Sequence, residues 1–238
     1  RDQLENRQQE EVLMSSQDHA AQRRTAACTL RQHLKGETAA LHQRLEAELG
    51  LLEPDLSIHR YCRVLCAFHG FYAPVEVSLV RLTAVAPPLG FPLRARSELL
   101  ESDLLALGLS RREIAELPRC TDLPRLSCPE DLAGCLYVLE GACLGGQVIA
   151  SAVRQRFGVA KGNGASFFIG DAEATSARWI LVLAWLEGLA RGGAQSEEIV
   201  ASARATFLTL ARWVEQQGAS RQPVRVGEAE RHGRPDRL

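Results

Sequence analysis

The apolar residues of this chain recur at a helical spacing along almost its whole length, and this pattern constrains the fold more than any other feature. Leu30, Leu34, Leu41, Leu45 and Leu49 form one such stripe, at intervals that bring side chains to one face of an α-helix. No stretch shows the alternation of apolar and polar residues typical of a β-strand, and none carries a hairpin signal. The sequence therefore predicts an all-α fold, a bundle of several helices.

Capping and helix-breaking residues set the expected helix boundaries. Ser57, Ser97 and Ser110 are expected N-caps, since a serine side chain can accept a hydrogen bond from the first helical turn. Pro74 lies inside the second helix and is expected to kink or divide it. The stretch 158–170 is expected to be a loop. The expected helices span residues 30–49, 57–82, 97–107, 110–117, 129–157, 172–190 and 196–217.

Length and composition fit one domain with flexible ends. A chain of 238 residues, 46% of them hydrophobic, suffices for one sizeable core. Residues 1–28 are polar and lack a sustained apolar stripe. Residues 218–238 are rich in Arg and have little to bury, so both ends are expected to be tails. The folded domain is expected over residues 29–217.

Charge and cysteine usage narrow the class of protein. The 28 Lys and Arg residues are balanced by 29 Asp and Glu residues, which argues against a broad nucleic-acid surface. No run reaches the roughly 18 uncharged apolar residues of a membrane span, and the N-terminal stretch lacks the apolar core of a signal peptide. The seven cysteines are scattered without a Cys-x-x-Cys pair, which favours reduced thiols. We therefore expect a soluble cytoplasmic protein without nucleic-acid or membrane partners.

His42 lies at the edge of the leucine stripe, with Glu46 four residues later and within reach of its ring. A carboxylate that binds one ring nitrogen fixes the tautomer and leaves the other nitrogen free for a metal. A histidine beside a leucine stripe is, however, more often an ordinary boundary residue. His33, His59 and His69 are rivals; His69 has no carboxylate at the matching spacing.

Three glycines, Gly141, Gly145 and Gly146, interrupt an otherwise strong helical pattern. Each costs a helix about 1 kcal/mol relative to alanine. Gly141 and Gly145 share one face, and Gly146 adds freedom to bend. A face without side chains lets a flat ligand approach the backbone. Close packing against another helix explains the same glycines equally well.

Together these segments resemble the haem oxygenase family. His42 with Glu46 is followed about a hundred residues later by the glycine-rich segment Leu139-Glu-Gly-Ala-Cys-Leu-Gly-Gly-Gln-Val148. The nearest likeness is to the bacterial branch that makes biliverdin for bacteriophytochromes. The likeness runs from about Leu30 to Trp213. Supporting segments are residues 103–108, residues 167–170 with Thr175 and Trp179, and residues 205–207.

The resemblance implies a single-domain bundle that holds haem between a proximal helix and a kinked distal helix. His42 would be the axial iron ligand, with Glu46 as its partner. Gly141, Gly145 and Gly146 would form the catalytic distal surface. The implied reaction is oxidative cleavage of haem to biliverdin, with release of carbon monoxide and ferrous iron. Haem would be both cofactor and substrate, and molecular oxygen and an external electron donor would be consumed. A reductase or ferredoxin would supply electrons, and a bacteriophytochrome could accept the biliverdin.

Three more residues are expected near the rim of that pocket. Lys35, two turns before His42, is the first candidate for a haem propionate, and Arg178 is a weaker one. Tyr137, one turn before Gly141, could meet the pocket edge. A plain surface or core role is an equal alternative for each of the three.

Two departures from the family pattern bear on turnover. Ala142 stands where the animal enzymes carry an aspartate that holds a water network, and the segment after Gly170 differs from that of the bacterial relatives. Two alternatives to the enzyme therefore stay open. One is a haem-binding or haem-sensing protein without turnover, and the other is a helical scaffold of the same fold without haem.

Overall fold

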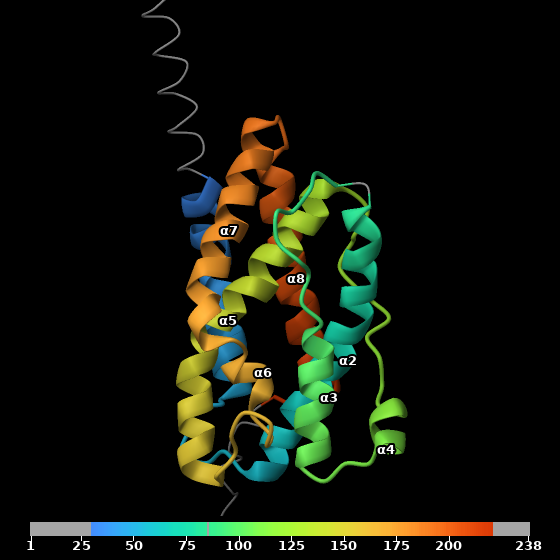
Figure 1. Cartoon of the computed structure of the whole chain (residues 1–238), viewed down its shortest axis with the longest axis vertical. Helices are drawn as coiled ribbons and strands as arrows, with labels where there is room; N and C mark the ends of the chain where they lie inside the picture. Colours follow the sequence, from blue (N-terminus) through green and yellow to red (C-terminus); the bar gives the residue numbers. More distant parts are fainter. Residues whose placement is uncertain (1–29, 85, 221–238) are drawn as a thin grey trace, which may run out of the picture.

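The structure, a computed structural model, describes residues 30–84 and 86–220. Within these residues the chain consists of helices and their connections, with no named strand, so the all-α prediction is confirmed (Figure 1). The expected tails, residues 1–28 and 218–238, lie outside the described residues, except for 218–220.

The first described helix covers residues 30–49 and carries His42; we call it the His42 helix. The expected helix 129–157 is confirmed at both ends, and the last two helices end within one residue of expectation. In chain order the helices after the His42 helix are α2 (Ile58–Thr83), α3 (Arg96–Ala106), α4 (Arg111–Ala115), α5 (Pro129–Phe157), α6 (Ser166–Ile169), α7 (Ala172–Arg191) and α8 (Ser196–Gln216).

Two of the three predicted serine caps are confirmed, and the third is wrong. Ser57 accepts a hydrogen bond from Arg60 N at 3.2 Å, and Ser110 forms a capping box with Glu113. Helix α3 instead has Ala95 as its N-cap, without a side-chain cap. Ser97 lies inside the first turn, where its backbone N–H donates to Glu76 on α2. This carboxylate is distant in the sequence, so the spacing of residues could not predict the contact.

The expected loop at 158–170 contains one short helix, α6, which sequence reasoning missed. Its first N–H groups, those of Ser166 and Phe167, donate to the two carboxylate oxygens of Asp103, each at 2.7 Å. Asp103 belongs to α3 and is fully buried. A helix of four residues is too short to form on its own, so α6 depends on this distant carboxylate.

Helix α2 continues through Pro74 and is not divided there. A proline inside a helix leaves the carbonyl four residues earlier without its usual donor. That carbonyl belongs to Gly70, and it accepts instead from Cys120 N at 2.9 Å. A Cβ at position 70 would lie 2.5 Å from Pro118 O, so the glycine is what allows the 118–120 segment to come close enough.

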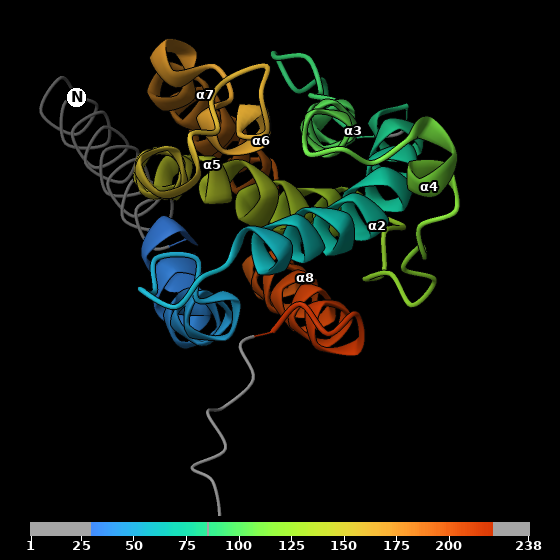
Figure 2. The ribbon, with the colours of Figure 1, turned by 90° about the horizontal axis from the view of Figure 1, so that it is seen from below.

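Helix α5 occupies the middle of the bundle. It packs against α8, α7, α6 and α2, and it bends along its length in Figure 1. Viewed from below, α5 and α2 lie between α8 on one side and α3, α6 and α7 on the other (Figure 2). In the described part of the chain, α5 alone is long and apolar enough to cross a membrane, and 56% of its most apolar window is buried inside the protein. Burial in this core accounts for its apolar length.

Candidate functional site

A cavity of about 360 Å³ lies between the His42 helix and α5. His42 and Lys35 line it from the first helix, and Tyr137 and Gly141 line it from α5. Trp179 of α7 and Phe207 of α8 complete its walls. We call it the His42 cavity. The structure thus brings together four of the predicted site residues from two segments about a hundred residues apart.

His42 is held at the cavity wall by a carboxylate and an aromatic ring. Its Nδ1 lies 3.4 Å from Oε2 of Glu46, and the edge of its ring meets Phe207, with ring centroids 5.8 Å apart. The side chain remains 49% exposed. Because Glu46 engages Nδ1, the ring nitrogen left for a metal is Nε2.

The three glycines of α5 do not share one role. A Cβ at Gly145 would meet no described atom within 4 Å, and one at Gly141 would only touch the ring of Trp179 at 3.5 Å. A Cβ at Gly146 would lie 2.4 Å from Phe168 O, so this residue is a glycine because α6 packs against it. Gly145 lines a neighbouring cavity of about 360 Å³, which Glu46 also lines. The backbone of α5 is therefore open at Gly145, whereas at Gly141 it is in contact with the ring of Trp179.

The end of the His42 cavity near Lys35 is cationic. Arg31, one turn before Lys35 on the same helix face, also lines the cavity; sequence reasoning missed it, although the four-residue spacing was visible. Tyr137 lies at this end as well, with its ring 5.5 Å from that of Trp179. Burial raises the pKa of Tyr137, while a hydrogen bond with Thr38 and the charge of Arg31 act in the opposite direction.

Arg178 is not brought together with His42. Its guanidinium binds both carboxylate oxygens of Glu140 on α5, at 2.7 and 2.5 Å, and each of the two side chains is only 7% exposed. The guanidinium also lies over the ring of Phe91, 5.0 Å from its centroid. The structure therefore places Arg178 in an interior ion pair that fixes α7 to α5 just before Gly141.

A second set of polar contacts supports α5 from behind the glycine segment. Nη1 of Arg96 lies 2.7 Å from Sγ of Cys143, and Nη2 donates to Phe167 O at 2.7 Å. Gln147 donates to Ile169 O at 2.7 Å. Burial raises the pKa of Asp103, against the hydrogen bonds from α6 that it accepts. These contacts hold α6 in the position where its backbone meets Gly146.

Ala142 lines the His42 cavity, so the departure noted in the sequence falls within the site. Its methyl group offers neither charge nor hydrogen bond. The changed segment after Gly170 begins α7, where Thr175 Oγ1 donates to Asp171 O at 2.8 Å. Of the two departures, only Ala142 is among the residues that line the cavity.

Comparison with known proteins identifies the family and the fold of this chain. The family described as Heme oxygenase matches residues 28–216. The chain belongs to the haem oxygenase family. The chain also resembles a solved structure titled "Structure of Heme Oxygenase from Leptospira interrogans", with a TM-score of 0.64 and 21% identity, over 79% of this chain and 98% of that one. The likeness confirms the haem oxygenase fold. The comparison with curated proteins found no match.

Family membership supports a haem-degrading oxidoreductase, with haem as its substrate. The residues of the His42 cavity fit that group. An imidazole nitrogen is a common iron ligand in haem proteins, and His42 offers one opposite a helix face that carries no side chains at Gly141 and Gly145. Lys35 and Arg31 provide positive charge at one end, where carboxylates of the ligand would bind.

Proposed function

We propose that this chain binds haem between the His42 helix and α5 and cleaves it to biliverdin, carbon monoxide and ferrous iron. The observation that carries the proposal is the pairing of His42 with Gly141 across one cavity, beside the open backbone face at Gly145. Haem, when bound, supplies the oxidisable ring and an iron that activates molecular oxygen. Its ligation and orientation depend on this chain.

His42 and Glu46 would set the position of the iron. The Glu46 carboxylate, 3.4 Å from Nδ1, would accept a hydrogen bond from the protonated Nδ1. The other ring nitrogen, Nε2, would then stay unprotonated and available to bind iron. The edge-on contact with Phe207 limits rotation of the imidazole. An imidazole held in one orientation presents the same edge of its ring to α5 at each turnover.

The bare face of α5 would do two things for the reaction. It lets the macrocycle lie close to the helix backbone, and it leaves space for a molecule as small as oxygen. Because Gly141 is covered by Trp179 at ordinary contact distance, whereas Gly145 is open, the space beside Gly145 is the larger. Lys35 and Arg31 would bind the propionates and fix the rotation of the ring, with Tyr137 at the edge of the site.

The physiological partners form part of the proposal. The reaction needs an external electron donor, a reductase or a ferredoxin, and a bacteriophytochrome is the proposed acceptor of biliverdin. A reducing cytoplasm fits the cysteines, because the six in the described part of the chain are all free thiols.

A haem-binding protein without turnover is the second candidate, and Ala142 favours it. A carboxylate at that position would hold water beside the reacting oxygen, and the methyl group that lines the cavity cannot.

Haem titration followed by reduction in air separates the two candidates. On addition of haem, we expect a Soret band that saturates at one haem per chain. After reduction in air, this band should bleach as a biliverdin spectrum develops. A stable Soret band that never bleaches would refute turnover and leave the binding protein. No Soret shift on adding haem would refute both.

His42→Ala tests the ligand assignment, and His33→Ala is its matched control. Both histidines lie on the same helix with a carboxylate near Nδ1, since His33 is 3.8 Å from Glu197, but His33 does not line the cavity. We expect His42→Ala to lose most of the Soret intensity and turnover, and to unfold at the wild-type temperature. We expect His33→Ala to retain the haem spectrum. Equal loss in the two variants would contradict the assignment.

A further inference from the structure

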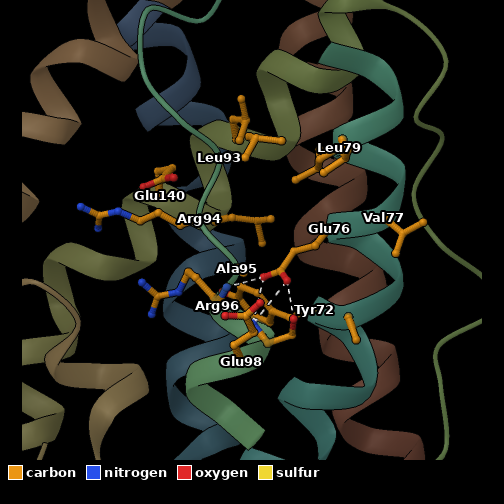
Figure 3. A pocket seen from close by; sticks show the side chains of 15 residues that line it. Tyr72, Glu76, Val77, Leu79, Leu93, Arg94, Ala95, Arg96, Glu98 and Glu140 are labelled. Carbon is orange, nitrogen blue, oxygen red and sulfur yellow. Dashed lines mark hydrogen bonds between the residues drawn. The ribbon is translucent and has the colours of Figure 1, made fainter. Parts of the chain in front are cut away.

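A second cavity, of about 310 Å³, lies on the opposite side of α5 from the His42 cavity. Tyr72 and Glu76 of α2, Arg94 and Arg96 before and at the start of α3, and Glu140 of α5 line it (Figure 3). We call it the Arg96 cavity. The two cavities share no lining residue. On a helical wheel, the residues that α5 contributes to one cavity and those that it contributes to the other point on average to opposite sides, so α5 itself separates the two cavities. Its volume is within the range of small-molecule sites.

One part of the Arg96 cavity is apolar. Leu79 and Leu93 lie together at the end away from the glutamates of α2 and α3 (Figure 3). Leu136 and Leu139 of α5 extend the same wall. Val77 is 53% exposed on α2 and stands at the edge of the cavity. An alkyl chain or a small ring that binds here would leave water and contact these side chains, which favours binding of an apolar group.

The other part carries two guanidinium groups that the protein leaves incompletely paired. Arg96 is only 6% exposed, and its Nε is buried without a hydrogen-bond partner among the described residues. Its other nitrogens contact a thiol and a carbonyl, as described above, and not a carboxylate. Arg94 forms no ion pair within residues 30–84 and 86–220. The Arg96 guanidinium also lies over the ring of Phe167, 4.3 Å from its centroid, so Arg94 is the guanidinium of this cavity that a ligand carboxylate could pair with.

The carboxylates of the same cavity are already engaged or lie in solvent. Glu140 is paired with Arg178. Glu76 accepts hydrogen bonds from Arg96 N at 2.8 Å and Ser97 N at 3.1 Å, at the start of α3. Glu98 is exposed. The charges of Arg94, Arg96, Glu140 and Arg178 all act on the pKa of the Cys143 thiol. Among the described residues, Arg94 is therefore left without an ion-pair partner in this cavity.

We propose that the Arg96 cavity is a second small-molecule site, which binds a monocarboxylate with a short apolar chain or ring. The carboxylate would pair with Arg94, close to the buried charge of Arg96, and the apolar part would lie among Leu79, Leu93 and Leu136. At roughly 30 Å³ for an atom the size of water, 310 Å³ holds about ten heavy atoms, the number in octanoate. The site is independent of the proposed reaction in the His42 cavity.

Calorimetric titration of the full chain with octanoate tests the site, and 1-octanol is the matched neutral probe. We expect saturable 1:1 binding of octanoate that is at least tenfold tighter than that of 1-octanol, since hydrogen bonds to a charged group are the stronger ones. Absence of saturable octanoate binding, or equal affinity for the two probes, would overturn the proposal.

Four variants locate the binding. Arg94→Gln is expected to weaken octanoate about tenfold and to leave 1-octanol unchanged, while Arg63→Gln, an exposed arginine of α2 outside this cavity, leaves both unchanged. Ala73→Leu, which fills the cavity from α2, is expected to abolish binding of both probes.

Lys35→Gln in the His42 cavity is expected to change the affinity for neither probe. If Lys35→Gln weakens octanoate and Arg94→Gln does not, the site is the His42 cavity and the proposal is wrong. Circular dichroism confirms the fold of each variant.

Discussion

Glycines on different sides of the same helix, α5, have opposite roles. On the sides that face α8 and α6, a Cβ at Gly134 would lie 2.4 Å from Ile199 O, and one at Gly146 would lie 2.4 Å from Phe168 O. On the side that faces the His42 helix, a Cβ at Gly145 would meet no described atom within 4 Å. The first two glycines permit contact between backbones, and the third keeps a space open. Glycine lowers helix propensity by the same amount at each position. Only the residues around each glycine show whether it permits a close contact or keeps a space open.

The largest effect is expected at Gly134. Alanine there would put its methyl against Ile199 O, Ala203 N and Ser202 Cβ, all closer than 3.0 Å, so α8 would have to move from its main contact with α5. We expect Gly134→Ala to destabilise the protein by about 3 kcal/mol and to lower the Tm by roughly 6–12 °C, measured by thermal denaturation. Gly188→Ala in α7, where the methyl would meet nothing within 4 Å among the described atoms, is the control and should not lower the Tm.

A smaller loss is expected at Gly146. One backbone oxygen, that of Phe168, blocks a methyl group there, and α6 is a single turn that can move more readily than α8. We expect Gly146→Ala to cost about 2 kcal/mol, measured by urea denaturation. Because α6 is held by Asp103, the variant should also expose the amides of Ser166 and Phe167 to hydrogen exchange. Unchanged protection of these amides would contradict the contact.

The smallest effect, and of the opposite sign, is expected at Gly145. Alanine restores helix propensity without a clash, so Gly145→Ala should stabilise the haem-free protein by up to about 1 kcal/mol. The same methyl projects into the space assigned to haem, and haem affinity in a Soret titration should fall severalfold. If Gly145→Ala destabilises the protein as Gly146→Ala does, the contrast between the two sides of α5 is wrong.

Local signals in the sequence predicted most of the fold. The bounds of α5, the Ser57 cap and the capping box of Ser110 with Glu113 depend on residues within a few positions of each other. The two errors both involve a distant partner. The first N–H groups of α3 donate to Glu76, about twenty residues earlier, and those of α6 donate to Asp103, about sixty residues earlier. Neither pairing has a spacing that a helical pattern could reveal.

The candidate site divides in the same way. His42 and Glu46 are one turn apart, and their contact was predicted from that spacing. The partner of Arg178 is Glu140, on another helix, and no periodic pattern joins them. The difference between Gly145 and Gly146 is equally invisible in sequence, since it depends on where Phe168 lies. Gly134 could not be linked to α8 before the position of Ile199 was known.

The central position of α5 has a consequence for synthesis of the chain. Its main packing partner, α8, begins at Ser196 and ends at Gln216, so the ribosome adds about 60 residues after Phe157 before that partner is complete. At roughly 5–20 residues per second, α5 spends several seconds without α8 packed against it. During that interval it resembles a membrane segment in length and composition. The nascent chain is therefore most exposed to chaperones and to aggregation between the completion of α5 and that of α8.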